Sequence, residues 1–355
     1  MKLALLTSGG DAPGMNSGIR AIAKICAGRG IEVVGVELGY EGLIDGVFRP
    51  LTLVHEGKLT LRKEIESCGG WGGTVLGSAR SERFRSQAGR RQAAEHLQRE
   101  GVEGLFVIGG NGSLHGAMLL ADEHGIPVVG MPASIDNDIG CTGSCIGVDT
   151  ALNTIIDACD RISDTASAHR RAFVVEVMGR DCGYLAMASG IAAGADAVLM
   201  REQDRSEAET IDEAEQVIRR GFDRGKLRVL LIKSEGVTVP CTKMVRELNE
   251  RIEGDHVRAT VLGHVVRGGR PSYEDRRMAN RMGLQMVEAM SRGQVGTMVA
   301  WRPTVDGGTE TVDPSIRLFP LQQVAEETRA VLEGTSQVMQ WRLKMMAKVA
   351  GVLGV

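Results

Sequence analysis

Short apolar runs rich in β-branched residues recur along the chain, and more polar stretches separate them. The runs lie at residues 2–7, 31–38, 104–110, 126–131, 171–177 and 227–233. Continuous apolar runs of this length are typical of strands that are buried on both faces of a parallel sheet. We therefore predict a strand at each run.

The stretch between the first two runs has the spacing of an amphipathic helix. The apolar residues that recur every three or four positions are Met15, Ile19, Ile22 and Cys26. Charged residues fall on another face, which predicts a crossover helix between two parallel strands. Because strands and helical patterns alternate to about residue 300, we predict an α/β fold with two similar open, mostly parallel sheets and helices on both faces.

The composition is that of a globular enzyme. A chain of 355 residues favours two domains. Hydrophobic residues make up 43% and charged residues 25%, and the net charge of −3 provides no basic field for nucleic acid. With 47 glycines and only 3% aromatic residues, the chain favours many tight loops over a surface that stacks bases. We expect no nucleic-acid partner.

The cysteines and the N-terminal segment indicate a cytoplasmic protein. The seven cysteines include no CxxC pair, and an odd number without framework spacing predicts reduced thiols. Cys141 and Cys145 have no nearby His to complete a metal site, so we interpret them as loop cysteines. The apolar run in MKLALLTSGG is too short for a signal sequence or a membrane span. We expect no membrane partner.

Three segments with unusual composition follow predicted strands. They are TSGGDAPGMN after the first strand, GGNGS after the strand that ends at Ile108, and PASIDND after the strand that ends at Met131. Open α/β sheets bind ligands beyond the carboxyl ends of their strands, and glycine there lets backbone N–H groups approach phosphate oxygens. A tight turn would explain either glycine loop alone, but two such loops in one half of the chain favour a phosphate site.

Carboxylates and arginines complete the candidate chemistry. Ser134, Asp136 and Asp138 in PASIDND are suited to general-base work beside a metal or phosphate, with an ordinary surface loop as the alternative. Arginines at strand ends suit bidentate contact with phosphate. The candidates are Arg170, Arg171, Arg180, Arg258, Arg267 and Arg270. His264, taken alone, would be interpreted as an interior histidine.

In this order, the motifs resemble those of the phosphofructokinase family. The matching stretches are LLTSGGDAPGMN, GGTVLGSARSERF, GGNGS, PASIDND, VVEVMGR and RATVLGHVVRGG, which span about residues 1–300. Lipid and NAD kinases share a loop similar to GGNGS, but they would leave the downstream motifs unexplained. The resemblance implies a phosphofructokinase-like, Rossmann-related fold and phosphoryl transfer from ATP, with Mg²⁺, to the 1-hydroxyl of fructose 6-phosphate.

The resemblance also implies roles for individual residues. Asp136 matches the general base, with Ser134 and Asp138 beside it, and Arg80 and Arg180 match residues that stabilise the transferring group. The positions that match nucleotide and magnesium contacts are Gly10, Tyr40, Arg80, Phe84, Arg85, Gly110, Asn111, Gly112 and Ser113. The positions that match sugar-phosphate contacts are Ser134, Asp136, Asp138, Met178, Gly179, Arg180, Glu235, His264 and Arg267.

Domain organisation and assembly follow from the same resemblance. It implies a nucleotide-binding domain of residues 1–146 plus about 266–315, and a sugar-phosphate-binding domain of residues 147–265 plus about 316–355. Arg171 and Arg258 match arginines that reach a neighbouring subunit's site. We therefore expect a homo-oligomer, a dimer or a tetramer.

Residue 111 departs from the family pattern. The family usually has an Asp there that helps to hold magnesium, and Asn111 keeps an oxygen ligand but loses the charge. We expect weaker metal binding. A non-catalytic paralogue is the alternative, but the joint presence of Asp136, Arg180 and the sugar-phosphate positions favours an active kinase.

Two small residues bear on the phosphoryl donor. The pyrophosphate-dependent branch typically has an Asp at position 112 and a Lys at position 133, where this chain has Gly112 and Ala133. Small residues leave room for the α-phosphate of a nucleotide, so we predict ATP. Pyrophosphate stays the alternative because Ala133 is not the usual glycine of the ATP branch. Other acceptors, such as sedoheptulose 7-phosphate or tagatose 6-phosphate, also stay open.

The last stretch of the chain lies beyond the matching motifs. Val338, Trp341, Met345 and Val349 recur there at helical spacing. The pattern predicts a helix that packs against the fold or forms an interface, with a partner-binding helix as the alternative.

Overall fold

The computed structural model describes residues 1–254 and 256–353, and it divides into two compact units. Unit 1 comprises Met1–Ile135, Ile139–Thr150 and Arg267–Ala330. Unit 2 comprises Asp136–Asp138, Ala151–Val266 and Val331–Val355. The units differ from the predicted domains at residues 136–138, 147–150 and 316–330. The prediction placed residues 136–138 in the first domain, but they belong to unit 2, and it placed the other two stretches in the second domain, but they belong to unit 1. Residues 316–330 group with unit 1 because β14 pairs with β12 of that unit.

Unit 1 is built on an eight-stranded sheet with the order β13-β14-β12-β7-β6-β1-β2-β3. Its strands are β1 (Lys2–Ser8), β2 (Glu32–Val36), β3 (Phe48–Pro50), β6 (Gly104–Gly109), β7 (Val128–Pro132), β12 (Thr297–Trp301), β13 (Thr309–Glu310) and β14 (Ile316–Pro320). The neighbours from β2 to β12 run parallel, and antiparallel strands flank them. A separate hairpin joins β4 (Thr52–His55) and β5 (Lys58–Leu61).

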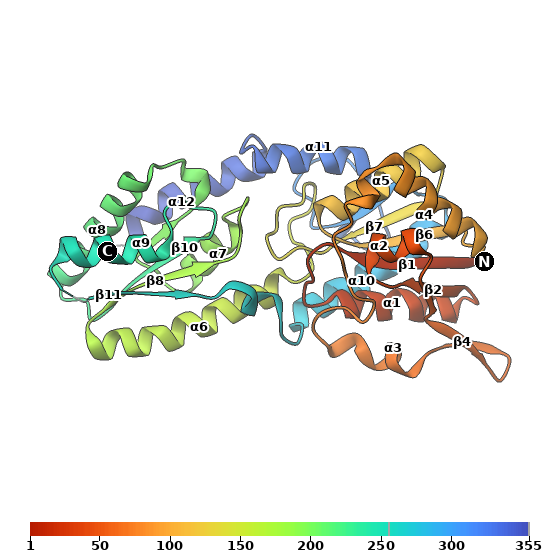
Figure 1. Cartoon of the computed structure of the whole chain (residues 1–355), viewed down its shortest axis with the longest axis horizontal. Helices are drawn as coiled ribbons and strands as arrows, with labels where there is room; N and C mark the ends of the chain where they lie inside the picture. The colour runs from red at the N-terminus through yellow and green to blue at the C-terminus, as the bar shows by residue number, and fades with distance from the viewer. Residues whose placement is uncertain (255, 354–355) are drawn as a thin grey trace. The chain divides into compact units, whose positions relative to one another are not determined.

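Helices cover both faces of this sheet (Figure 1). The helices of the unit are α1 (Met15–Gly28), α2 (Gly39–Asp45), α3 (Lys63–Ser67), α4 (Gln87–Arg99), α5 (Asn111–His124), α10 (Tyr273–Ser291) and α11 (Leu321–Leu332). A Cβ at Gly18 of α1 would lie 3.2 Å from the sulfur of Met131, whereas one at Gly130 would lie 2.5 Å from Leu114 of α5. Because Gly130 and Met131 are neighbours on β7 and point to opposite faces, α1 and α5 flank the sheet on opposite sides.

Unit 2 is built on a four-stranded parallel sheet with the order β11-β8-β10-β9. Its strands are β8 (Ala172–Val177), β9 (Ala197–Leu199), β10 (Val229–Ser234) and β11 (Val257–Val261). Its helices are α6 (Val148–His169, whose first residues belong to unit 1), α7 (Tyr184–Ala192), α8 (Glu207–Asp223), α9 (Cys241–Ile252) and α12 (Gln337–Leu353). Ile211 and Ile218 of α8 and Met244 of α9 pack with strand residues in one buried apolar cluster.

The predicted fold class and strands are confirmed. Each predicted apolar run forms a strand, and the predicted crossover helix is α1, whose four apolar positions are buried. The sheets are α/β and mostly parallel as expected, although they differ in size, with eight strands and four. None of the described helices is long and apolar enough to cross a membrane.

The C-terminal helix α12 forms where predicted and packs against the fold, but only part of the predicted stripe does so. Val338 packs against a buried cluster that includes Met339, whereas Trp341 is 55% exposed. The buried row instead contains Met339, Arg342 and Met346, and Arg342 is only 5% exposed. The sequence pattern failed here because an arginine occupies a buried position that apolar spacing assigns to the surface.

One lysine is buried inside the sheet of unit 2. Lys233 on β10 is 1% exposed, and its Nζ lies 2.8 Å from the Oε2 of Glu176, its register partner on β8. Removing one member of a buried ion pair leaves the other charge uncompensated. We expect Lys233→Met to lower the free energy of unfolding by about 3 kcal/mol or more, measured by urea unfolding followed by circular dichroism.

The matched control is Lys243→Met, which also removes a lysine from an ion pair of unit 2. Lys243 pairs with Glu207 at the surface. Exposed ion pairs contribute little to stability, so this variant should unfold close to the unsubstituted chain. Equal unfolding midpoints for the two variants would contradict the stabilising role of the buried pair.

Candidate active site

The GGNGS segment opens helix α5 at the carboxyl end of β6. Gly110 precedes the helix, Asn111 is its first residue, and no side chain caps this first turn. Asn111 is partly exposed and Gly112 is exposed. The start of a long helix carries partial positive charge and N–H groups without helical partners. This end of α5 therefore suits a phosphate.

The loop after β1 packs tightly against that segment. A Cβ at Gly109 would lie 2.5 Å from the carbonyl oxygen of Ser8, and one at Gly9, whose φ is 86°, would lie 3.2 Å from the Oγ of Ser113. These two positions require glycine. Around Gly112, in contrast, a Cβ would meet nothing within 4 Å. The predicted glycine loops thus meet, and they leave open space at residue 112.

Arg267 lies beside the loop after β1. Its Nη1 donates a hydrogen bond to the carbonyl of Asp11 at 3.4 Å, and a Cβ at Gly10 would lie 2.7 Å from the same nitrogen. Gly10 therefore makes room for the guanidinium, which stays partly exposed. The structure joins a residue predicted for the sugar phosphate with one predicted for the nucleotide.

The predicted nucleotide residues Tyr40 and Phe84 form a buried pair. Their rings stack with centroids 3.9 Å apart, and the Tyr40 hydroxyl donates to the Ser113 carbonyl at 2.6 Å. Burial raises the pKa of Tyr40, so the hydroxyl stays protonated and remains a donor. The stacked pair therefore packs against α5. Arg80 and Arg85 are exposed, and Arg85 pairs with Glu82 at 3.3 Å.

One positioning residue escaped sequence reasoning. Asn16, buried at the start of α1, donates to the carbonyls of Trp71 and Gly72 and accepts from the N–H of Val75. It fixes the loop that leads toward Arg80. The sequence could have indicated this residue, because Asn16 is an amide side chain next to the apolar stripe of a crossover helix.

The end of β7 brings Ser134 beside the GGNGS loop. The N–H of Ala133 donates to the Gly109 carbonyl at 2.9 Å. A Cβ at Gly110 would lie 4.0 Å from the Cβ of Ser134. Within unit 1, Ser134 therefore joins the predicted nucleotide residues.

Two loops of unit 2 interlock at the carboxyl ends of β8 and β10. Gly179, with a φ of 113°, accepts a 2.6 Å hydrogen bond from the Ser234 hydroxyl through its carbonyl. The N–H of Glu235 donates to Val177, and a Cβ at Gly236 would collide with the carbonyl of Arg180. The structure thus brings the predicted residues Met178, Gly179, Arg180 and Glu235 together. The Arg180 side chain is exposed.

The segment Asp136–Asp138 belongs to unit 2. Asn137 at its centre is buried and has a φ of 51°. Its carbonyl accepts hydrogen bonds from Nη1 and Nη2 of Arg342 at 3.4 and 3.3 Å. Asp136 and Asp138 on either side are partly exposed residues, although the Oδ1 atom of Asp136 is buried.

Two other predicted residues lie at the opposite end of this sheet. Arg171 directly precedes β8, and Arg258 is the second residue of β11, beside Phe173 in the register. The strand rise of about 3.3 Å per residue separates Arg171 from Met178 by about 23 Å. Within unit 2, these arginines do not join the cluster at Arg180. His264 is exposed, which excludes the interior histidine that its sequence context alone would favour.

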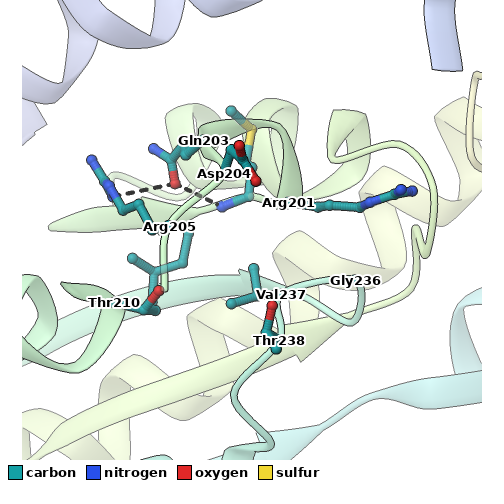
Figure 2. Close-up of a pocket in the computed structure, with 10 residues that line it drawn as sticks. Arg201, Gln203, Asp204, Arg205, Thr210, Gly236, Val237 and Thr238 are labelled. Carbon is teal, nitrogen blue, oxygen red and sulfur yellow. Dashed lines mark hydrogen bonds between the residues drawn. The ribbon is translucent and has the colours of Figure 1, made fainter. Parts of the chain in front are cut away.

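A small pocket of about 140 Å³ lies in unit 2 next to the interlocked loops (Figure 2). Its walls are Leu199, Met200, Arg201, Gln203, Asp204, Arg205, Thr210, Gly236, Val237 and Thr238. Arg205 contacts Gln203, as Figure 2 shows, and also pairs with Glu213. Arg201 pairs with Asp181 at 2.7 Å. No predicted site residue lines this pocket.

Possible protein ligands for a metal ion can be identified in the part of the chain that the structure describes. Among the described residues, no group of three His, Cys, Asp or Glu side chains is placed to hold a metal ion. Mg²⁺ is commonly bound by one or two protein ligands together with phosphate oxygens and water. Asn111 at the start of α5 has a side-chain oxygen of the kind that such an ion can bind. The cysteines of CTGSC are buried, and burial raises the pKa of the Cys141 thiol to about 12.

Comparison with known proteins identifies a family. The family model described as Phosphofructokinase matches residues 2–290. An ATP-dependent 6-phosphofructokinase of Thermotoga neapolitana is 48% identical over 299 residues, 84% of this chain and 89% of the relative. One of Halothermothrix orenii is 40% identical over 337 residues, 92% of this chain and 96% of the relative.

Solved structures show the same fold. The T-state phosphofructokinase of Pichia pastoris matches with a TM-score of 0.85 and 31% identity. The match covers 98% of this chain, which spans only 39% of that larger chain. A pyrophosphate-dependent phosphofructokinase of Marinobacter aquaeolei matches with a TM-score of 0.75 over 92% of this chain and 84% of that chain, and at 21% identity it shows the fold alone.

Proposed function

Because the chain belongs to the phosphofructokinase family, we propose that it transfers the γ-phosphoryl group of ATP to the 1-hydroxyl of fructose 6-phosphate. The observation that carries this proposal is the uncapped start of α5 in the GGNGS segment, with open space at Gly112. Backbone N–H groups there can hold the donor's phosphates. Unit 1 would bind the nucleotide, and the strand ends of unit 2 would bind the sugar phosphate. The product is fructose 1,6-bisphosphate, so the reaction is a step of glycolysis.

The chemistry needs one base and several positive charges. Asp136 would accept the proton of the 1-hydroxyl as the hydroxyl oxygen bonds to the γ-phosphorus, while the bond from that phosphorus to the β–γ bridging oxygen breaks and ADP leaves. Arg80 and Arg180, both exposed, would stabilise the charge that develops on the transferring group. Ser134 and Asp138 would orient the reacting groups. No covalent enzyme intermediate is required, because positioning and charge stabilisation suffice for phosphoryl transfer.

The remaining predicted residues would hold the substrates. Met178, Gly179 and Glu235, which the interlocked loops bring together, would contact the sugar phosphate, as would His264 and Arg267. Arg171 and Arg258 lie at the far end of β8 from Met178. That placement supports a role in a neighbouring subunit's site, and hence a homo-oligomer, a dimer or a tetramer. A cytoplasmic location remains part of the proposal.

Magnesium would accompany the nucleotide and neutralise charge on its phosphates. Asn111, the first residue of α5, would contribute a neutral amide oxygen where the family usually has a carboxylate. Most of the ion's ligands would then be phosphate oxygens and water.

We expect Asn111→Asp to lower the magnesium concentration that gives half-maximal activity. A carboxylate binds a hard divalent cation more strongly than an amide oxygen does. The measurement is a magnesium titration at saturating fructose 6-phosphate, paired with calorimetric binding of Mg–nucleotide. Asn153→Asp is the control, because it makes the same change on α6, away from the glycine loops in sequence. An unchanged or higher magnesium requirement in Asn111→Asp would refute this account of the loop.

Pyrophosphate is the alternative donor, and Gly112 argues against it. The open space at this residue leaves room for the α-phosphate of a nucleotide. The acceptor is tested by comparing kcat/KM for fructose 6-phosphate, tagatose 6-phosphate and sedoheptulose 7-phosphate at saturating ATP. The proposal requires fructose 6-phosphate to be preferred, and a higher kcat/KM for either of the others would reassign the acceptor.

A further inference from the structure

Arg342 is a buried guanidinium in the C-terminal helix α12. Only 5% of the residue is exposed, and it lies beyond residues 2–290, the part of the chain that the family model matches. Burying a guanidinium is costly unless it finds hydrogen-bond acceptors. An arginine in the buried row of a helix therefore needs a specific partner, and the identity of that partner indicates what the arginine does.

The partner is the predicted catalytic segment. Nη1 and Nη2 of Arg342 both donate to the backbone carbonyl of Asn137, at 3.4 and 3.3 Å. Nη1 also lies 3.5 Å from the sulfur of Cys182, and the guanidinium carbon lies 4.5 Å from the centre of the Tyr184 ring. Burial raises the pKa of Cys182 to about 12, so its thiol is a neutral neighbour. All of these residues belong to unit 2.

The contact falls at the turn between the two carboxylates. Asn137 has a φ of 51°, in the left-handed region that asparagine adopts more readily than most residues with a side chain. Two donors on one carbonyl fix the orientation of the peptide that follows Asn137. Asp136 and Asp138 flank that residue, so the direction of both carboxylates depends on the same backbone turn.

We propose that Arg342 is a positioning residue that holds the Asn137 peptide and thereby aims the Asp136 carboxylate. This inference rests on the proposed function, in which Asp136 is the general base. It gives the C-terminal helix a role in the reaction, through the backbone of a segment about 200 residues earlier in the chain. A misplacement of about 1 Å at a catalytic group can cost about 100-fold in rate, so loss of the anchor should appear in kcat.

The first test is Arg342→Met. Methionine keeps an unbranched apolar stem but has neither the N–H donors nor the cation that lies over the Tyr184 ring. We expect kcat to fall about 10- to 100-fold, while KM for fructose 6-phosphate and for ATP changes less than about threefold. Arg342→Lys, which keeps a charged donor, should recover part of the loss. The matched control is Lys344→Met, which removes an exposed positive charge from the same helix and should leave kcat unchanged.

The second test separates positioning from a general structural effect. If Arg342 acts through Asp136, Arg342→Met should lower kcat much less in the Asp136→Asn background, because the base it aims is already gone. An equal loss in both backgrounds, or an unchanged kcat in Arg342→Met alone, would overturn the inference. If the methionine variant does not fold, the same comparison is made with Arg342→Lys.

The two proposals can fail separately. Near-full activity of Asp136→Asn alone would remove the base assignment and this inference with it. A strongly impaired Asp136→Asn together with an unaffected Arg342→Met would leave the proposed function standing and remove only the role of Arg342.

Discussion

Asp136→Asn is expected to lower kcat by about 10²- to 10⁴-fold, the usual contribution of a general base. Asparagine has nearly the shape of aspartate but cannot accept the proton of the acceptor hydroxyl. Contacts to the sugar phosphate should survive, so KM for fructose 6-phosphate should change little. The measurement is steady-state kinetics with both substrates varied.

The control for this substitution is Asp223→Asn. Asp223 is the exposed last residue of α8 in unit 2. Its substitution removes the same charge at a position far from the predicted base in sequence. It should match the unsubstituted chain in kcat and KM. A normal kcat for Asp136→Asn would mean that another group accepts the proton.

Arg180→Met should lower kcat by about 10²- to 10³-fold, the scale measured for losing one transition-state donor. The carbonyl of Arg180 packs closely against Gly236, which holds the Arg180 backbone in place, whereas the Arg180 side chain is exposed. The substitution therefore removes a charge from a rigid position without opening a core. Both kcat and kcat/KM should fall together, because the contact strengthens as charge develops on the transferring phosphoryl group.

Arg201→Met is the matched control for Arg180→Met. Arg201 also follows a strand of the same sheet, but it already pairs with Asp181 and lines the small pocket. Its loss should leave kcat unchanged. A rise in KM for fructose 6-phosphate with normal kcat in Arg180→Met would assign Arg180 to substrate binding alone.

Hydrophobic patterning predicted the centre of the fold. Runs such as residues 104–110 form strands buried on both faces, where apolar sequence and structure agree. The edge strands β3 and β13 were not predicted, because three and two residues are too few to give a periodic signal. Strands β4, β5, β9, β11, β12 and β14 were not predicted either, although β12 is mostly buried. The face of α12 was misjudged because Arg342 is buried by hydrogen bonds, which spacing rules cannot anticipate.

The sequence predicted which residues belong to the candidate site better than it predicted the contacts between them. Sequence reasoning found the GGNGS loop and its position at the start of α5, since strand ends and glycines mark it. It did not find that Tyr40 and Phe84 stack beneath α5, that Asn16 fixes the loop before Arg80, or that Arg267 lies beside Gly10. These contacts join residues distant in the chain, and only the folded backbone brings them together.

The measurement that tests the central claim most directly is a coupled assay of fructose 1,6-bisphosphate formation from the purified chain and fructose 6-phosphate. ATP and pyrophosphate are compared in parallel across a magnesium titration. Turnover with ATP and not with pyrophosphate is the predicted result, with a magnesium requirement that Asn111→Asp lowers. Turnover with pyrophosphate alone would overturn the donor, and no turnover with either would contradict the proposed activity.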